Sequence, residues 1–219
     1  NKYENFEKEQ SKIISEIIKV EKLLIAKSNS LTNSRNKIIP NFEKEIINLL
    51  MTLGMPHAFF KVKMEKSTEF LKTGMDKVTF EFSSNPGIKE QDISKIASGG
   101  EISRLVLALK FITSAKSGVK TIIFDEIDTG VSGKIAHKMG GLMQQISNNM
   151  QVIGITHLPQ VAAKGDEQLL VKKDNLKAVT ETKLYKLNNE ERVQELAKML
   201  SGSEVTATAI SNAKELLSA

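Results

Sequence analysis

The sequence contains no cysteine, which excludes a disulfide framework and any zinc site built on cysteine. It has no apolar run near the roughly 20 residues that a helix needs to span a bilayer, and its first residues lack a signal-peptide pattern. A cysteine-free chain also suits a reducing compartment. We therefore expect a cytoplasmic protein that does not enter a membrane.

The composition is typical of a globular domain with an appendage. Of the 219 residues, 40% are apolar, which is enough to build a hydrophobic core, so disorder is not expected. The chain has 31 Lys and Arg against 26 Asp and Glu, a net charge of +5 and a pI near 9.2. This balance permits a polyanion such as DNA as a partner but does not indicate one.

Glycine is absent from the first forty residues, where apolar residues recur at heptad spacing. A period of 3.5 predicts a coiled-coil arm helix over residues 1–40. We expect Pro40 to end this helix, because its ring cannot continue the hydrogen-bond ladder. The alternative is an amphipathic helix packed on its own domain, but forty helical residues would be about 60 Å long and would overhang such a domain. The two apolar columns are Phe6, Ile13 and Val20, and Tyr3, Ile17, Leu24, Leu31 and Ile38.

Residues 41–219 predict a domain of the α/β class. A helix to Leu53 and two strands precede a region in which strands alternate with helices, and apolar strands joined in this way indicate a mainly parallel sheet covered by helices. After the first two strands, at 59–64 and 77–82, we expect helices at 100–116 and 134–147, strands at 121–127, 151–156, 168–173 and 180–187, a short helix near 160 and two C-terminal helices.

The segment TIIFDEIDTG has the form of a Walker B motif, with four strand residues followed by two acids. The strand would deliver Asp125 and Glu126 to the carboxyl end of the sheet, where ligands bind in open α/β folds. Asp125 could hold Mg²⁺, which prefers hard oxygen ligands, and Glu126 could orient or deprotonate a water. The alternative is a pair of acids at the start of an ordinary turn.

The segment SGGE, residues Ser98, Gly99, Gly100 and Glu101, opens the helix that precedes this strand. Ser98 is a plausible N-cap, and the two glycines leave backbone N–H groups uncovered at the positive end of the helix. Such a helix start can bind a phosphate. A serine-capped helix after a flexible loop would have the same sequence.

The segment QVIGITHLPQVA predicts a strand that ends at Thr156 and is followed by His157. His157 would then stand at the same sheet edge as Asp125 and Glu126, where its imidazole could donate a hydrogen bond to a phosphate oxygen or position a water. A histidine at the end of a strand is nevertheless often purely structural.

In this order, the three motifs resemble the C-terminal half of an ATP-binding-cassette (ABC) ATPase head. The segments SNPG, KIASGGEISR, LALK, IFDEIDTGVSG, QVIGITHLPQVA and ERVQELAKMLSG are similar to the RecN family, SMC-like ATPases of bacterial DNA double-strand-break repair and recombination. The resemblance covers essentially the whole chain. The signature reads ASGGE where transporters have LSGGQ, which disfavours a transporter nucleotide-binding domain.

The resemblance implies a role for each site residue. Asp125 corresponds to the aspartate that helps hold Mg²⁺, Glu126 to the glutamate that activates the hydrolytic water, and His157 to the switch histidine that senses the γ-phosphate of ATP. Ser98, Gly99, Gly100 and Glu101 correspond to the signature motif, which contacts ATP held by the opposing head of a homodimer. The helix of residues 1–40 corresponds to the second strand of an antiparallel coiled-coil arm, and DNA is implied as a partner.

The phosphate-binding motif GxxxxGK[ST] is missing, although ATP binding in this class requires it. We therefore expect the chain to be a C-terminal fragment that needs its own N-terminal half and does not hydrolyse ATP alone. The full-length protein is expected to be a nucleoid-associated ATPase in DNA repair. The alternative is a non-catalytic ABC-like module for dimerisation or DNA bridging.

Overall fold

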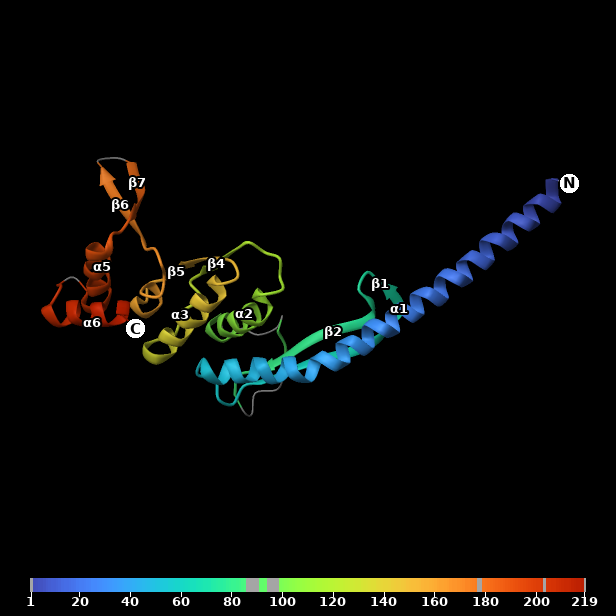
Figure 1. The fold of residues 1–219 in the computed structure, drawn as a ribbon, viewed down its shortest axis with the longest axis horizontal. Coiled ribbons are helices and arrows are strands. Elements are labelled where there is room, and N and C mark those ends of the chain that lie inside the picture. The colour runs from blue at the N-terminus through green and yellow to red at the C-terminus, as the bar shows by residue number, and fades with distance from the viewer. Residues whose placement is uncertain (1, 86–90, 94–98, 177–178, 203, 219) are drawn as a thin grey trace. The chain divides into compact units, whose positions relative to one another are not determined.

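The computed structural model of the chain describes residues 2–85, 91–93, 99–176, 179–202 and 204–218 (Figure 1). They form two compact units. We call Asn1–Ile47 with Ala58–Lys95 the helix–hairpin unit, and Asn48–His57 with Ile96–Ala219 the α/β unit. The division into an arm of residues 1–40 and a head lobe of residues 41–219 stays a prediction.

A single helix, α1 (Lys2–Thr52), contains Pro40 in its interior, so the expectation that Pro40 ends the helix is wrong. Proline removes one helical hydrogen bond and crowds the preceding turn, which costs about 3 kcal/mol. Packing of the residues that follow offsets this cost. The ring of Phe42 meets that of Phe60 edge-on with centroids 5.9 Å apart. The side chain of Glu43 accepts a hydrogen bond from the amide of Val62 at 2.8 Å.

The helix–hairpin unit also contains an antiparallel sheet of β1 (Phe59–Leu71), β2 (Gly74–Ser83) and β3 (Gln91–Asp92), in that order. The two expected strands are confirmed and are longer than the sequence pattern suggested. Phe60 pairs with Phe82 and Val62 with Phe80, and the rings of Phe60 and Phe80 stack at 5.7 Å. The buried pair Phe60 and Phe82, with the stacked ring of Phe80, thus fixes the register of the hairpin.

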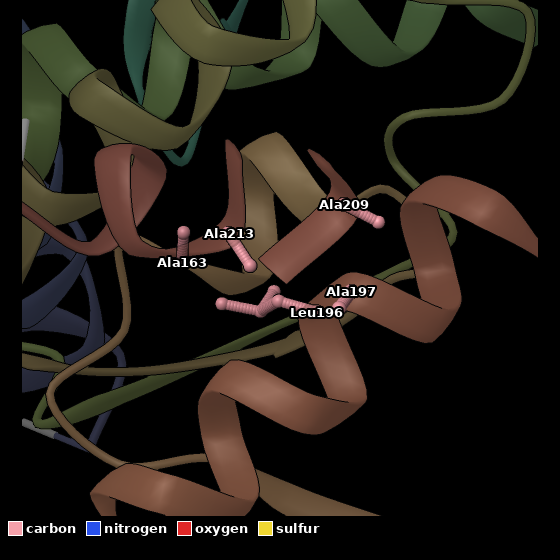
Figure 2. Close-up of a cluster of buried hydrophobic side chains, with 5 residues drawn as sticks. All are labelled: Ala163, Leu196, Ala197, Ala209 and Ala213. Atoms are coloured by element: carbon pink, nitrogen blue, oxygen red, sulfur yellow. The ribbon is translucent and has the colours of Figure 1, made fainter. Parts of the chain in front are cut away.

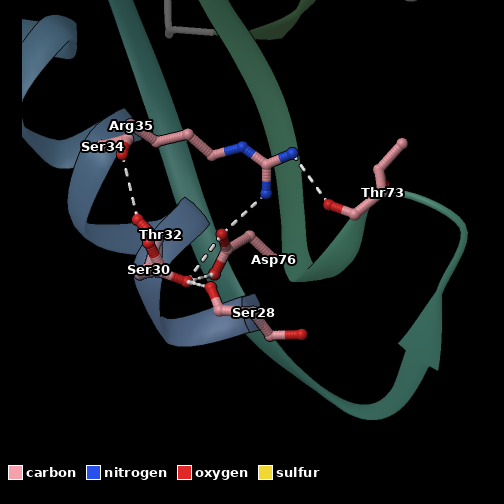
Figure 3. Close-up of polar contacts among 7 residues, drawn as sticks. All are labelled: Ser28, Ser30, Thr32, Ser34, Arg35, Thr73 and Asp76. Carbon is pink, nitrogen blue, oxygen red and sulfur yellow. Dashed lines mark hydrogen bonds and ion pairs between the residues drawn. The ribbon is translucent and has the colours of Figure 1, made fainter. Parts of the chain in front are cut away.

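A buried carboxylate ties the hairpin to α1 (Figure 3). Asp76 on β2 is only 6% exposed, and the Thr32 hydroxyl lies 2.8 Å from each of its carboxylate oxygens. Arg35 donates from Nη1 to Asp76 Oδ2 at 2.7 Å and from Nη2 to the carbonyl oxygen of Thr73 at 2.8 Å. The Thr32 hydroxyl and the Arg35 guanidinium hold the pKa of Asp76 below its ordinary value, although burial acts in the opposite direction.

The α/β unit contains α2 (Gly99–Ser114), β4 (Thr121–Asp125), α3 (Gly133–Ser147) and β5 (Gln151–Ile155). Strands β4 and β5 pair in parallel, with Thr121 opposite Gln151 and Asp125 opposite Ile155. Both helices bury apolar side chains, which confirms the α/β class; these include Leu105, Leu107 and Ala108 of α2 and Met139, Leu142 and Ile146 of α3.

The next two strands form a separate hairpin. After the short helix α4 (Pro159–Ala162), β6 (Leu169–Leu176) pairs antiparallel with β7 (Val179–Lys186). The expectation that residues 168–173 belong to the parallel sheet is therefore wrong. An apolar run predicts a strand but not its partner, and the neighbouring strand in the chain is the partner that requires the least loop closure.

Two helices complete the α/β unit, α5 (Asn189–Ser201) and α6 (Ala207–Ser218). A capping box between Asn188 and Glu191 starts α5. Small side chains let α4, α5 and α6 approach closely around Leu196, in a cluster that also holds Ala163, Ala197, Ala209 and Ala213 (Figure 2). Within the described ranges, no helix combines the length and apolar character that a membrane crossing requires.

Replacing Asp76 with Asn should lower the free energy of unfolding by about 2 kcal/mol at neutral pH, because Thr32 and Arg35 lose a charged acceptor. The folded-state pKa of Asp76 lies below the unfolded-state value. Its contribution is therefore fully present above the unfolded-state pKa of about 4, and is lost as the pH falls through the folded-state pKa. The gap between wild type and Asp76→Asn should thus shrink in acid.

Urea denaturation followed by circular dichroism at about pH 7 and about pH 3 measures this gap. Glu69→Gln, a change at an exposed site on the same hairpin, is the matched control and should stay within about 0.5 kcal/mol of wild type. An equal gap at both pH values would contradict the role of the ionised Asp76 carboxylate.

Candidate functional site

The carboxyl ends of β4 and β5 lie side by side in the α/β unit (Figure 1). Asp125 is the last residue of β4 and lies opposite Ile155, and the amide of Glu126 donates to the Ile155 carbonyl oxygen at 3.2 Å. His157 follows Ile155 by two residues. The structure thus brings the expected residues Asp125, Glu126 and His157 to one edge of the strand pair.

Glu126 has a strained backbone. Its φ angle is +47°, and within the described residues it is the one non-glycine residue in this left-handed region. Such a conformation costs about 1–3 kcal/mol and persists where surrounding contacts enforce it. Here the Glu126 carbonyl oxygen accepts hydrogen bonds from the amide and hydroxyl of Thr129 at 3.2 and 2.9 Å. These bonds fold the chain back just beyond β4, and the Glu126 side chain is exposed.

The loop after β4 also holds an acid that sequence reasoning missed. Asp128 is completely buried and accepts a hydrogen bond at Oδ2 from the Thr156 hydroxyl. Its Oδ1 lies 3.8 Å from Nδ1 of His157. The sequence signal was a third acid, spaced three residues after Asp125, between the apolar residues Ile127 and Val131 that are themselves buried.

The start of α2 packs against the same loop. Gly99 and Gly100 form its first turn, and a Cβ on Gly100 would lie 2.8 Å from the carbonyl oxygen of Thr129. Among the described residues, a Cβ on Gly99 would have no neighbour within 4 Å. Only a glycine allows the close approach at position 100, whereas Gly99 leaves the helix start open. Glu101 follows in the first turn and is partly exposed, and Ser98 lies outside the described residues.

Arg104, one turn further along α2, supports this helix start. Its Nε donates to the Gly100 carbonyl oxygen at 3.0 Å, and its Nη1 donates to the carbonyl oxygen of Leu53, just beyond α1, at 3.2 Å. The guanidinium therefore links the first turn of α2 to the chain that leaves α1, a link that no sequence motif indicated.

The residues at this edge fit a magnesium–nucleotide ligand. The described residues contain no group of three or more His, Asp or Glu that could form a closed metal cage. Mg²⁺ does not need one, because it keeps several waters and binds through one or two carboxylates together with substrate phosphates. The exposed carboxylate of Asp125 can serve in this way. The open first turn of α2 can bind a phosphate through its N–H groups.

Curated relatives share a DNA-repair name. The chain is 40% identical to the DNA repair protein RecN of Vibrio cholerae serotype O1 over 212 residues, which are 96% of the chain and 38% of that protein. It is 42% identical to the DNA repair protein RecN of Haemophilus influenzae over 193 residues, which are 88% of the chain and 35% of that protein. The chain thus spans little more than a third of these relatives. No protein-family model matches it.

Solved structures with a similar fold are SMC heads. The Smc head domain with a coiled coil and joint from Pyrococcus yayanosii is 19% identical, with a TM-score of 0.62 over 90% of this chain and 35% of that one. An SMC ATPase studied for ATP-driven dimerization and DNA-stimulated activation is also 19% identical, with a TM-score of 0.52 over 78% of this chain and 99% of that one. At this identity the likeness concerns the fold, and it confirms the expected head-like α/β architecture.

Replacing Gly100 with Ala should destabilise the protein by about 1–3 kcal/mol, because the new methyl group would press on the backbone oxygen of Thr129 and not on a flexible side chain. Gly99→Ala is the matched control. Its new methyl group meets no neighbour among the described residues, so the variant should be neutral or stabilised by up to about 1 kcal/mol, because alanine favours the helix. Thermal unfolding of the two variants measures the difference, and equal stabilities would contradict the close approach of α2 to the loop.

Proposed function

We propose, from the premise that this chain is homologous to part of the RecN proteins, that it is the C-terminal part of a RecN-like ATPase acting in DNA double-strand-break repair and recombination. The observation that carries this proposal is the shared edge of β4 and β5, where Asp125 ends one strand and Glu126 and His157 follow the two strands. A general base, an acid suited to Mg²⁺ and a hydrogen-bond donor for phosphate are the groups that ATP hydrolysis needs.

Each residue at the edge has one role in the proposed reaction. Asp125 would hold Mg²⁺ together with ATP, and the bound ion would neutralise charge on the phosphates. Glu126 accepts a proton from the attacking water, a contribution worth about 10²–10⁴ in rate for a positioned general base. The hydrogen bonds from Thr129 to the Glu126 carbonyl oxygen hold the backbone from which the Glu126 side chain projects. His157 donates a hydrogen bond to an oxygen of the γ-phosphate.

The start of α2 serves the second nucleotide of a homodimer. Ser98, Gly99, Gly100 and Glu101 contact the γ-phosphate of ATP that the opposing head holds. The open surroundings of Gly99 support this assignment, because a phosphate from another molecule needs unobstructed access to the helix N–H groups. ATP would then join two heads, and hydrolysis would release them.

The N-terminal half of the head is the proposed partner of the β4–β5 pair. Strands of a parallel sheet are normally covered on both faces. Here Ile123, Ile153 and Ile155 are 62%, 41% and 52% exposed. We infer that the N-terminal half, which carries the missing phosphate loop, covers these side chains and completes the site.

The exposed apolar seam of α1 supports the coiled-coil arm. Side chains of both columns, among them Ile13, Ile17 and Leu24, are exposed at 43–53%. The first strand of the antiparallel arm, which lies outside this chain, would cover them. DNA is the proposed partner of the whole protein, with a nucleoid-associated place in the cytoplasm, and the net charge of +5 is compatible with it.

A non-catalytic module for dimerisation or DNA bridging is the second candidate. It would use the same head and arm but would not turn over ATP. The clustering of a buried acid, a strained Glu126 and His157 at one edge favours the enzyme, because dimerisation alone requires none of these features.

Glu126→Gln should lower kcat for ATP by about 10²–10³ in the full-length protein, which is this chain joined to its N-terminal half in cis or as a second chain. Glutamine keeps the size of the side chain but cannot take a proton from water. Steady-state phosphate release measures the effect. Glu215→Gln, a change at an exposed site on α6, is the matched control and should retain wild-type turnover.

This chain without its N-terminal half should not hydrolyse ATP, because it lacks GxxxxGK[ST]. Turnover by the isolated chain would refute that requirement. A full-length wild type without turnover would instead favour the non-catalytic candidate.

A further inference from the structure

Asp128 is a charged group that the roles proposed above leave unused. Its exposed fraction is 0%, and the Thr156 hydroxyl donates to its Oδ2. Its other oxygen, Oδ1, has no hydrogen-bond partner among the described residues. A buried carboxylate is costly unless it is fully hydrogen-bonded or paired with a cation, so this oxygen needs a donor.

His157 is the candidate donor. Its Nδ1 lies 3.8 Å from Asp128 Oδ1, and among the described residues it is the one basic group within ion-pair distance of that carboxylate. The separation is longer than a hydrogen bond, but a small rotation of the ring would close it. The imidazole is otherwise free to turn, because the His157 side chain is 67% exposed.

Thr156 fixes the backbone from which the imidazole projects. Its hydroxyl donates to Asp128, and its Oγ1 accepts a hydrogen bond from the amide of Leu158 at 2.9 Å. The residues on both sides of His157 are thereby tied to one oxygen atom, which is itself tied to the buried acid. The backbone at His157 is held in place, and the orientation of its ring depends on Asp128.

We propose that Asp128 is a positioning residue for His157. Its Oδ1 accepts a hydrogen bond from Nδ1–H and so turns Nε2 away from the loop and toward the γ-phosphate. This inference rests on the proposed function, because it gives His157 a nucleotide to face. An imidazole that is protonated on both nitrogens can donate to Asp128 and to a phosphate oxygen at the same time. Partners of this kind set the ring orientation and tautomer of functional histidines.

The tautomer of His157 tests this contact without any measurement of activity. In the full-length protein labelled with ¹⁵N-histidine, long-range nitrogen–proton correlation spectra distinguish a protonated Nδ1 from a bare one, and loss of signals in His157→Gln assigns the residue. We expect Nδ1 to carry a proton in the wild type with a bound non-hydrolysable ATP analogue. A bare Nδ1 in that complex would overturn the proposal, and this result needs no variant at position 128.

Asp128→Asn should remove the proton from Nδ1 of His157. The Thr156 hydroxyl keeps the asparagine oxygen on its own side, so the amide N–H₂ would face His157. A donor at that position favours an unprotonated Nδ1 and a proton on Nε2. An unchanged tautomer in a folded Asp128→Asn protein would mean that Asp128 does not govern the ring.

A double-mutant cycle tests whether the contact matters for the reaction. Asp128→Asn should lower kcat about tenfold, with less than about a twofold change in KM for ATP. In a His157→Ala background the same change should cost less than about twofold, because the group through which Asp128 acts is gone. A tenfold loss in both backgrounds would show that Asp128 acts elsewhere, for example on stability alone.

Failure of the proposed function gives a different result. If the full-length wild type did not turn over ATP, the double-mutant cycle would have no kcat values to compare. The protonation of His157 Nδ1 would still report on the contact with Asp128. If turnover depended on Glu126 and the tautomer did not depend on Asp128, this inference alone would fail.

Discussion

The parallel register of β4 and β5 is the constraint on which the site depends. Because Asp125 lies opposite Ile155, the two chains leave the sheet at the same level, and the amide of Glu126 adds one more hydrogen bond to Ile155 beyond the strand. A slip of one residue would turn every side chain of one strand to the other face. It would also separate Asp128 from Thr156, since each follows its strand at a fixed distance. The register of the two strands therefore determines where the loops after β4 and β5 lie, and with them the polar groups of the edge.

The loop after β4 shows how local strain and burial work together. A non-glycine residue at φ +47° is unfavourable on its own, and a buried carboxylate is unfavourable without donors. Both occur within three residues, at Glu126 and Asp128. The hydrogen bonds from Thr129 and Thr156, with burial of Ile127, offset these costs only if the loop takes this one path. The backbone of Glu126 is therefore held in one conformation, although its side chain is exposed to solvent.

Much of the element order was predictable, because apolar periodicity reflects which faces are buried. The strand–helix alternation and the placement of Asp125, Glu126 and His157 at strand ends follow from such local patterns. Three features do not. The helix α1 continues through Pro40 because Phe42, just after it, packs on Phe60 of β1, which is distant in sequence. Residues 168–173 pair with β7, since an apolar run leaves its partner open. Asp128 reaches Thr156 only through the register of β4 and β5, which no single segment of sequence encodes.

Folding and chemistry share one requirement in this chain. A pair of strands is marginally stable by itself and gains stability from cover on its faces. The exposed isoleucines lie on β4, which ends at Asp125, and on β5, which ends two residues before His157. Apolar cover on these strands would strengthen the register and would also remove water from the neighbourhood of the edge, where charges interact more strongly as the local dielectric falls. A segment that completes the sheet would thus stabilise the fold and, through the same contacts, strengthen the electrostatic interactions at the edge. The proposed catalytic residues thus lie beside strands whose exposed apolar side chains favour the addition of such a segment.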